Sequence, residues 1–593
     1  IVHYVLAFVF TAMYARKLGL TVAGSGLAAL VYTYGWFPPR VCNEWSIVGG
    51  TWMPLALWCV ESFLTTRWWR YLFVLITTLA VQMLAGHFML AFITQFVLTG
   101  YVPLRAWFAS GDLPAEVRSS RGRMMAGLAR SLLAAFALAA PQLLPTWELK
   151  QLSQRAILAG NYDPAFGSIP PKYFSQIALP WVWYPDASSF DDAVVPGAAR
   201  TNRVEAHLYF GLIPLALVVW RLCRLRSHGD RRLVVWIVLG LMGLVLAGGW
   251  LLPVLKHLPG FGFFEGAGRY GMITTLAAGV LAGSGLDSLL DFLSRNFKPW
   301  HQSRLTAGLL SGALATGLFA GTTADLHLVS RLVTHAILVK DPPANLIADS
   351  PLGRELNRFP QPVRLISEGK NLPSLLGVAT LPTYLGLGPA AYFDPELALP
   401  EGFDFEQSPS PQHLNWLRRG GVTHLLSFVP LDSRVWPVRP LWQGVDPVLH
   451  RALGRRADEP LFLYALGESR GRIAWDDPLP DSAMKLAEYS PGRVVVETAA
   501  KRDGRLILTD LSYPGWHITV DGKEREPLTV ERIFRGVELS AGNHTIIWTY
   551  RPAALYWGGG LSIATLTALL VLGHLRFWRP LWLRAPERAG QKS

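Results

Sequence analysis

The stretch GMITTLAAGVLAGSGL, residues 271–286, contains no charged side chain and consists mainly of small and aliphatic residues. It lies within an apolar span of residues 270–290, and a helix needs roughly 20 such residues to cross ~30 Å of hydrocarbon. Small residues at four-residue spacing, here Gly279/Gly283 and later Gly308/Gly312 and Gly317/Gly321, predict close packing between helices. The sequence therefore predicts a polytopic α-helical membrane protein of about 11 spans. The others lie near residues 1–15, 20–35, 51–65, 68–84, 87–106, 124–145, 207–223, 233–252, 304–323 and 556–577.

Composition and charge agree with a membrane protein. Of the 593 residues, 51% are hydrophobic and only 16% are charged, whereas about 25% charged residues is usual for soluble domains. The net charge of +13 is concentrated in arginine and lysine clusters that fall in every second loop, as the positive-inside rule requires. This placement argues against a nucleic-acid-binding protein. The three cysteines imply no disulfide framework.

The same rule predicts which segments lie outside the cytoplasm of a bacterial inner membrane. These segments are residues 36–50, 85–87, 148–206, 253–269 and 324–555, whereas the arginine-rich loops and the C-terminus lie inside. Tryptophans near the span ends, such as Trp45, Trp181 and Trp183, are typical of an aromatic belt. Because the span 1–15 runs from outside to inside, we expect at least one further span upstream of Ile1.

The chain is expected to contain a multi-span domain and an extracytoplasmic part. The predicted division is 1–323 with the outside loop 148–206, a mixed α/β region 324–470, a β-sandwich 471–555, a final transmembrane helix 556–577 and a basic cytoplasmic tail 578–593. The sandwich is predicted from β-prone runs at 494–498, 505–509, 516–520, 534–539 and 545–550, separated by turns such as Asp521-Gly522. Within it, Asp510, Asp521 and Glu538 are expected in turns and on the surface.

Several stretches of this C-terminal part are similar to a known family. They are Leu508-Thr509-Asp510-Leu511-Ser512-Tyr513-Pro514-Gly515-Trp516-His517, Val520-Asp521-Gly522-Lys523, Phe534-Arg535-Gly536-Val537, Ala541-Gly542-Asn543-His544 and Tyr550-Arg551-Pro552. Together they resemble the closing domain of the YfhO family. Weaker similarities in the membrane half are Ala85-Gly86-His87, the stretch from Pro141 to Glu148 with Ser153 and Arg155, and Gly268-Arg269-Tyr270.

The resemblance implies an activity that composition alone does not. YfhO proteins look like GT-C glycosyltransferases, which take a sugar from a polyprenyl-phosphate carrier and add it to an acceptor outside the cytoplasm. It also implies three partners: the lipid bilayer, the polyprenyl-phosphate sugar donor and an envelope glycan or polymer acceptor. The main acidic residue of GT-C enzymes follows their first span, so here it is expected upstream of Ile1.

Such a reaction needs a carboxylate to accept the proton of the acceptor hydroxyl. Glu148, just after the sixth predicted span, is the leading candidate in this chain, as a base or as a group that orients the acceptor. The alternative is an interfacial carboxylate paired with Lys150 or Arg155. Asp163 and Glu44 are weaker candidates.

The departing phosphate needs cationic or hydrogen-bonding groups. Arg155 and Arg269 are predicted to bind the donor phosphate, because a guanidinium contacts phosphate oxygens bidentately. Anchoring to lipid headgroups is the alternative, and Glu265, four residues earlier, is an available partner for Arg269. His87, at an outside turn, is predicted to donate a hydrogen bond to phosphate or sugar, with a structural role as the alternative.

Substrate contacts are predicted for four further residues, Gln142, His207, Tyr184 and Trp183. Gln142 lies inside a span, where an amide needs a partner, and the aromatic residues can stack on sugar faces or belong to the interfacial belt. No cofactor is assigned, and no spacing of His, Cys, Asp or Glu supports a metal site. Two other functions remain open, a non-catalytic scaffold or accessory subunit of envelope assembly and a transporter of lipid-linked glycan, although no internal repeat supports the transporter.

Overall fold

In the computed structural model the chain forms two compact units. The first comprises Ile1–Leu143, Tyr162–Ala336 and Trp557–Ser593, and the second Leu144–Asn161 and Ile337–Tyr556. The structure describes all residues except 42, 120, 158–162, 184–200, 226–230, 298–302, 334–345, 369–371, 382–386, 394–404, 406–407, 454–455, 457, 478–481 and 577–593. The predicted cytoplasmic tail 578–593 and Tyr184 therefore lie outside the described residues.

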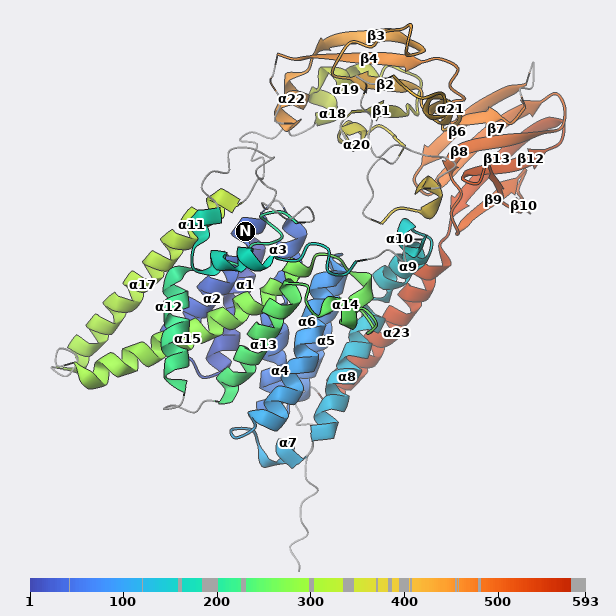
Figure 1. Cartoon of the computed structure of the whole chain (residues 1–593). Helices are drawn as coiled ribbons and strands as arrows, with labels where there is room; N and C mark the ends of the chain where they lie inside the picture. The colour runs from blue at the N-terminus through green and yellow to red at the C-terminus, as the bar shows by residue number, and fades with distance from the viewer. Residues whose placement is uncertain are drawn as a thin grey trace, which may run out of the picture. The chain divides into compact units, whose positions relative to one another are not determined.

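The first unit is helical. Its longer helices are α1 (Val2–Lys17), α2 (Val22–Trp36), α4 (Met53–Thr66), α5 (Trp69–Leu84), α6 (Phe88–Pro103), α8 (Arg121–Leu138), α12 (Leu212–Cys223), α13 (Arg231–Ala247), α15 (Gly271–Asn296), α17 (Arg304–Val333) and α23 (Ala553–Arg576). Short helices connect them: η1 (Pro38–Arg40), α3 (Glu44–Gly50), η2 (Leu104–Phe108), α7 (Ala115–Ser119), η4 (Pro171–Ile177), α11 (Pro180–Trp183), α14 (Leu252–Leu255), η7 (Phe261–Phe263) and η8 (Ala267–Tyr270). In Figure 1 α15 lies beside α2, α12 and α13, and its contacts are with these helices.

Every predicted span coincides with one of these helices, but the number of membrane crossings stays a prediction. Within the part of the chain that the structure describes, five helical stretches are long and apolar enough to cross a membrane: Glu44–Thr66, Phe88–Phe108, Ala267–Asn296, Leu305–Val333 and Ala553–Arg576. A sixth is possible if α8 and α9 (Ala140–Gln151) form one span, although they meet at a bend of 78°. The sixth predicted span is thus a broken helix, and α17 continues past the predicted end at residue 323 to Val333.

Two helices leave large apolar side chains uncovered. Leu305 and Leu309 on α17 are 74% and 66% exposed, and Ile563 and Leu570 on α23 are 68% and 66% exposed. Such extended apolar surfaces are unfavourable in water and suit a hydrocarbon environment. The structure therefore supports the prediction of a membrane protein.

Close packing of α15 on α2 explains the small residues of the opening stretch. A Cβ atom on Gly283 would lie 2.2 Å from the backbone oxygen of Gly24, and one on Gly279 would lie 2.8 Å from that of Ala28. The backbones of the two helices therefore touch where side chains are missing. By contrast, a Cβ atom on Gly308 of α17 meets no described atom within 4 Å.

We expect Gly283→Ala to destabilise the protein by about 1–3 kcal/mol, because the added methyl group forces α15 and α2 apart. Gly308→Ala is the matched control, since it adds the same atom to an open helix face and improves helix propensity by up to about 1 kcal/mol. Thermal unfolding in detergent compares the two variants. An equal melting temperature for Gly283→Ala and the unmodified protein contradicts this packing.

The second unit begins with a mixed α/β region. Strands β1 (Leu365–Ser367), β2 (His424–Ser427), β3 (Val438–Val445) and β4 (Pro460–Leu466) form a sheet of order β1-β2-β4-β3, in which only β1 and β2 are parallel. The described helices of this unit are the C-terminal part of α9, α10 (Gln154–Ile157), α18 (Leu346–Asp349), α19 (Pro351–Leu356), α20 (Leu372–Leu375), η9 (Ala390–Phe393), α21 (Pro411–Arg419) and α22 (Pro447–Leu453).

The prediction of a C-terminal β-sheet domain is confirmed. Its strands are β5 (Ile473–Trp475), β6 (Ala483–Ser490), β7 (Arg493–Ala500), β8 (Gly504–Leu511), β9 (Trp516–Val520), β10 (Lys523–Arg525), β11 (Leu528–Val530), β12 (Phe534–Leu539) and β13 (Gly542–Tyr550). They form two sheets, β10-β9-β13-β7-β6 and β11-β12-β8-β5. One core joins them, with Val496 and Trp548 from the first sheet and Leu506 and Val537 from the second. Asp521 and Gly522 have φ values of 52° and 78° in the β9–β10 hairpin, as the Asp-Gly signal predicts.

Candidate functional site

Four segments that the sequence places on one side of the membrane meet in the first unit. Trp45 comes from α3, His87 from the turn between α5 and α6, Glu205 from the segment before α12, and Arg269 from η8. We call these four residues the Arg269 cluster. The alternation of loops predicted from the arginine clusters requires these segments to share an end of the bundle, and their contacts agree with it.

Arg269 and Glu205 form a bidentate ion pair. Nε of Arg269 donates to Oε2 of Glu205 at 2.9 Å, and Nη2 donates to Oε1 at 2.8 Å. The third nitrogen, Nη1, donates long hydrogen bonds to the backbone oxygen of Glu265 at 3.4 Å and to Sδ of Met89 at 3.7 Å. The carboxylate that pairs with Arg269 is thus Glu205, because η8 turns the arginine toward the segment that precedes α12, while Glu265 contacts Arg269 through its backbone oxygen.

A glycine allows this turn. A Cβ atom on Gly268 would lie 2.5 Å from the backbone oxygen of Glu205 and 3.1 Å from that of Gly167. The amide of Gly268 donates to the Gly167 oxygen at 2.9 Å. The backbone before Arg269 therefore packs directly against two other segments, which explains the Gly-Arg-Tyr stretch in physical terms.

Trp45 packs against both basic groups of the cluster. The guanidinium carbon of Arg269 lies 4.4 Å from the centre of the Trp45 ring, within the range of a cation–π contact. The His87 ring stacks on the same indole, with ring centroids 4.0 Å apart and planes 11° apart. The prediction of an aromatic belt missed this role, because it considered only the position of Trp45 near a span end.

The imidazole of His87 is neutral near pH 7. Burial and the nearby Arg269 charge lower the pKa of His87 to about 4, against the opposing effect of Glu205. Nδ1 of His87 is buried and has no hydrogen-bond partner among the residues that the structure describes. A buried polar atom of this kind needs a partner, and a substrate oxygen or hydroxyl is suited to that role.

Glu205 is ionised in this setting. Burial acts to raise the pKa of Glu205, but the Arg269 hydrogen bonds and the charges of Arg269 and Arg40 outweigh it and lower this pKa. Arg40 is 1% exposed, lies 3.4 Å from the centre of the Trp36 ring and donates to the backbone oxygen of His207 at 2.8 Å. Arg40 thereby fixes the segment that carries Glu205.

We expect protonation of His87 to weaken the fold in acid. Histidine in the unfolded chain titrates near 6.5, whereas in the folded protein the pKa of His87 is about 4. Between these values the unfolded chain binds more protons, so stability falls as pH falls from 6.5 toward 4, by up to about 3 kcal/mol. Thermal unfolding of the unmodified protein and of His87→Gln between pH 7 and 4 measures this loss of stability. The variant should lack the part of the loss that His87 causes. Identical pH profiles contradict the buried neutral imidazole.

The remaining predicted site residues lie elsewhere. Glu148 lies on α9 in the second unit, where its charge, after burial, contributes to raising the pKa of Tyr513 to about 12. The helix of Arg155 belongs to the same unit, but the Arg155 side chain lies outside the described part. Gln142 is an exposed residue of α9. Trp183 donates from its indole to Ser175 Oγ at 2.9 Å and contacts the Tyr173 ring.

His207 and the two weaker acidic candidates have local roles. The side chain of His207 is 1% exposed and bonds to the backbone of Tyr209 and Gly35, so it offers no surface to a substrate and we omit it from the proposed site. Asp163 accepts a hydrogen bond from the amide of Ala165 at 2.9 Å. Glu44 is exposed at the start of α3. Among the described side chains, no three of His, Cys, Asp or Glu are grouped to hold a metal ion.

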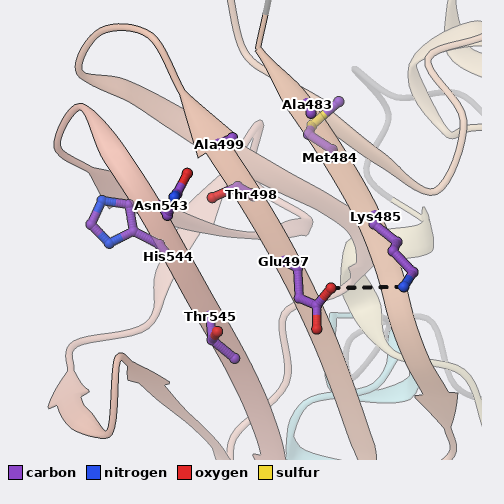
Figure 2. A pocket seen from close by; sticks show the side chains of 9 residues that line it. All are labelled: Ala483, Met484, Lys485, Glu497, Thr498, Ala499, Asn543, His544 and Thr545. Carbon is purple, nitrogen blue, oxygen red and sulfur yellow. Dashed lines mark ion pairs between the residues drawn. The ribbon is translucent and has the colours of Figure 1, made fainter.

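A shallow hollow is also present on the five-stranded sheet of the C-terminal domain. Figure 2 shows its lining on β6, β7 and β13, with Lys485 and Glu497 facing each other 3.9 Å apart. Both side chains are more than half exposed. The pair balances its own charge, and exposed pairs of this kind contribute little, so the hollow offers less chemistry than the Arg269 cluster.

The C-terminal part matches a known family. Residues 477–562 match the family model described as Bacterial membrane protein YfhO. This segment is similar to the YfhO family. The YfhO segment runs from the end of β5 through all later strands into α23, and it includes every C-terminal stretch on which the resemblance was based. The predicted YfhO resemblance is therefore confirmed, while the similar stretches around His87 and Arg269 lie outside the matched residues.

Solved structures give a more distant likeness. The arabinofuranosyltransferase AftD from mycobacteria superimposes with a TM-score of 0.43 at 12% identity, covering 93% of this chain and 50% of AftD. A mutant of the same enzyme gives 0.42 at 13% identity, with 93% and 53% covered. The chain thus spans about half the length of AftD. No curated protein sequence matches the chain significantly.

Proposed function

We propose that this protein is an integral-membrane glycosyltransferase. It transfers a sugar from a polyprenyl-phosphate-linked donor to an envelope glycan or polymer acceptor on the extracytoplasmic side of the bacterial inner membrane. The observation that carries the proposal is the Arg269 cluster, which places a cation, a carboxylate and a neutral imidazole with an open nitrogen at the ends of apolar helices. The YfhO segment supports the same function through the resemblance of its family to GT-C enzymes.

In the proposed reaction the acceptor hydroxyl attacks the anomeric carbon of the donor sugar. The bond from that carbon to the phosphate oxygen breaks, and polyprenyl phosphate leaves with the electron pair. A carboxylate takes the hydroxyl proton, a role for which Glu148 remains the candidate in this chain. Nη1 of Arg269, which Glu205 leaves uncovered, and Nδ1 of His87 are the groups proposed to meet the phosphate.

Glu205 is proposed to act as a positioning residue. Its two oxygens fix the orientation of the Arg269 guanidinium, and they prevent the cation from binding a phosphate too tightly to release it. Gln142, Trp183 and Tyr184 remain proposed contacts for sugar or acceptor, and Arg155 remains a second proposed phosphate ligand.

The decisive experiment is transfer by the full chain in proteoliposomes that contain a radiolabelled polyprenyl-phosphate sugar and an envelope extract as acceptor. An enzyme should lose transfer when Glu148, Arg155 and Arg269 are all replaced by glutamine, with membrane insertion unchanged. A scaffold subunit should show no transfer with or without the triple replacement, and it should otherwise tolerate that replacement. A transporter of lipid-linked glycan, for which the bent pair α8–α9 is the one supporting feature, should move the donor across the bilayer without cleaving it.

A further inference from the structure

A buried ion cluster in the second unit is centred on Asp510. This carboxylate on β8 is 8% exposed, so the prediction that it lies in a surface turn is wrong. Three arginines contact it through Nη2: Arg364 at 2.9 Å, Arg472 at 2.5 Å and Arg535 at 3.1 Å. We call these four residues the Asp510 cluster.

The cluster is assembled from distant parts of the second unit. Arg364 precedes β1, Arg472 precedes β5, and Arg535 lies on β12. Arg364 also donates to the backbone oxygen of Thr509 at 2.8 Å and to that of Gly420. The arginines therefore join the α/β sheet to the sheet that contains β8, which is a structural role.

Charge is not balanced within the cluster. Arg364, Arg472 and Arg535 have 4–5% of their side-chain surface exposed, and arginine stays protonated in proteins. One carboxylate thus leaves two positive charges uncompensated. Among the described residues, no second carboxylate lies within ion-pair distance of these arginines, and the nearby Glu531 pairs with Arg419 and Arg470 instead.

Several guanidinium nitrogens also lack hydrogen-bond partners. Nε and Nη1 of Arg472, Nε and Nη1 of Arg535, and Nε of Arg364 are buried without a partner among the described residues. A buried donor without a partner destabilises the fold, and an unpaired buried charge destabilises it further. A junction that only joined two sheets would not need this excess of charge and donors.

Two aromatic side chains contact the charged groups of the Asp510 cluster. The Arg535 guanidinium lies 3.7 Å from the centre of the Trp516 ring, which fixes its plane. The Tyr489 hydroxyl accepts from Arg472 and donates to Asp510 at 3.2 Å. Tyr489 is 40% exposed, so the cluster reaches the surface beside this ring.

We propose that the Asp510 cluster is a binding site for a phosphate group. Phosphate offers more acceptor oxygens than the Asp510 carboxylate, carries up to two negative charges and is contacted by guanidinium groups in a bidentate manner. Two charges match the excess in the cluster, and the open N–H groups of Arg472 and Arg535 supply donors beside Tyr489. This site is separate from the Arg269 cluster, so the proposal does not depend on transferase activity.

The test is saturable binding to the full chain in nanodiscs of zwitterionic lipid in chloride buffer. The probes are inorganic phosphate and dimethyl phosphate, both radiolabelled, and equilibrium dialysis measures their binding. We expect one site per chain, and Arg472→Gln or Arg535→Gln should weaken it about tenfold or more, the loss of one charge-assisted hydrogen bond. Arg505→Gln, on an exposed arginine that pairs with Asp476 and Glu538, should leave the affinity unchanged.

The two probes distinguish the source of the phosphate. Tighter binding of inorganic phosphate points to a free or terminal phosphate, and equal or tighter binding of the diester points to a phosphodiester of a polymer or lipid headgroup. The proposal is overturned if neither probe binds saturably. It is also overturned if Arg472→Gln and Arg535→Gln both retain the affinity of the unmodified protein.

A second measurement uses the unmodified protein and remains decisive if the Arg472 and Arg535 variants fail to fold. Phosphate should slow the modification of Arg472 and Arg535 by phenylglyoxal in the unmodified protein, while that of Arg505 should not change. Mass spectrometry of the peptides reports each rate. Equal rates with and without phosphate at Arg472 and Arg535 overturn the proposal.

Discussion

Arg269→Gln is expected to lower kcat/KM for glycosyl transfer by about 10²–10³-fold, the usual loss when one group that stabilises a developing negative charge is removed. In the proposed reaction the Arg269 guanidinium meets the departing phosphate through Nη1, which would exchange its long hydrogen bonds to Glu265 and Met89 for the phosphate, while Nε and Nη2 stay on Glu205. The effect should therefore appear mainly in kcat, because charge on the phosphate oxygen grows as the glycosidic bond breaks. Transfer from the radiolabelled donor in proteoliposomes measures it.

Folding needs a separate control, since Arg269→Gln leaves Glu205 buried without its cation. The variant Arg269→Gln/Glu205→Gln removes both charges and keeps the cluster neutral. It should unfold near the temperature of the unmodified protein yet transfer as poorly as Arg269→Gln alone. Arg295→Gln, on an arginine whose side chain is 69% exposed and pairs with Asp291, should keep full activity. Transfer within about threefold of normal in the double variant contradicts the role given to Arg269.

Glu205 gives a different kinetic signature if it acts only through Arg269. Glu205→Asp keeps the charge and shortens the side chain, so it should restore part of the activity that Glu205→Gln loses. A residue that contributes only to folding would show equal activity per folded molecule in both variants.

The helices were predictable from sequence because their signal is local. An apolar stretch such as residues 271–286 contains its own evidence, and Gly279 and Gly283 pack as their spacing predicts. The β-prone runs from 494 to 550 likewise coincide with strands, because alternation and the Asp521-Gly522 turn are short-range features. The bend between α8 and α9 was not predicted, since Ala139 to Pro141 reads as a continuous apolar stretch.

The sites were predictable only as single residues. Arg269 and His87 are predicted as site residues, whereas Trp45 is predicted only as part of the aromatic belt and Glu205 not at all, because long stretches of chain separate these partners. Reasoning from local spacing favours a partner four residues away, and this is why Glu265 is expected where Glu205 is found. Asp510 shows the same limit, since three arginines from separate elements bury it.

Glu61 and Arg105 form a buried ion pair in the helical unit. Glu61 on α4 is 1% exposed and Arg105 in η2 is fully buried. Nη2 of Arg105 donates to Oε1 of Glu61 at 2.8 Å, and Tyr101 donates to Oε2 at 2.8 Å. The charge of Arg105 thus lies inside the protein.

Glu61→Leu is therefore expected to destabilise the protein by about 3–5 kcal/mol, because it leaves a buried guanidinium with only Asp112, whose side chain is 44% exposed, as its carboxylate partner. Glu61→Leu/Arg105→Met removes both charges and should recover most of this loss, as apolar replacements of buried ion pairs often do. Thermal unfolding and the yield of folded protein in detergent compare the two variants. If the double variant is no more stable than Glu61→Leu, the cost of the unpaired charge is not the cause. The Tyr101 hydrogen bond and the packing of α4 against α6 would then carry the stability of this region.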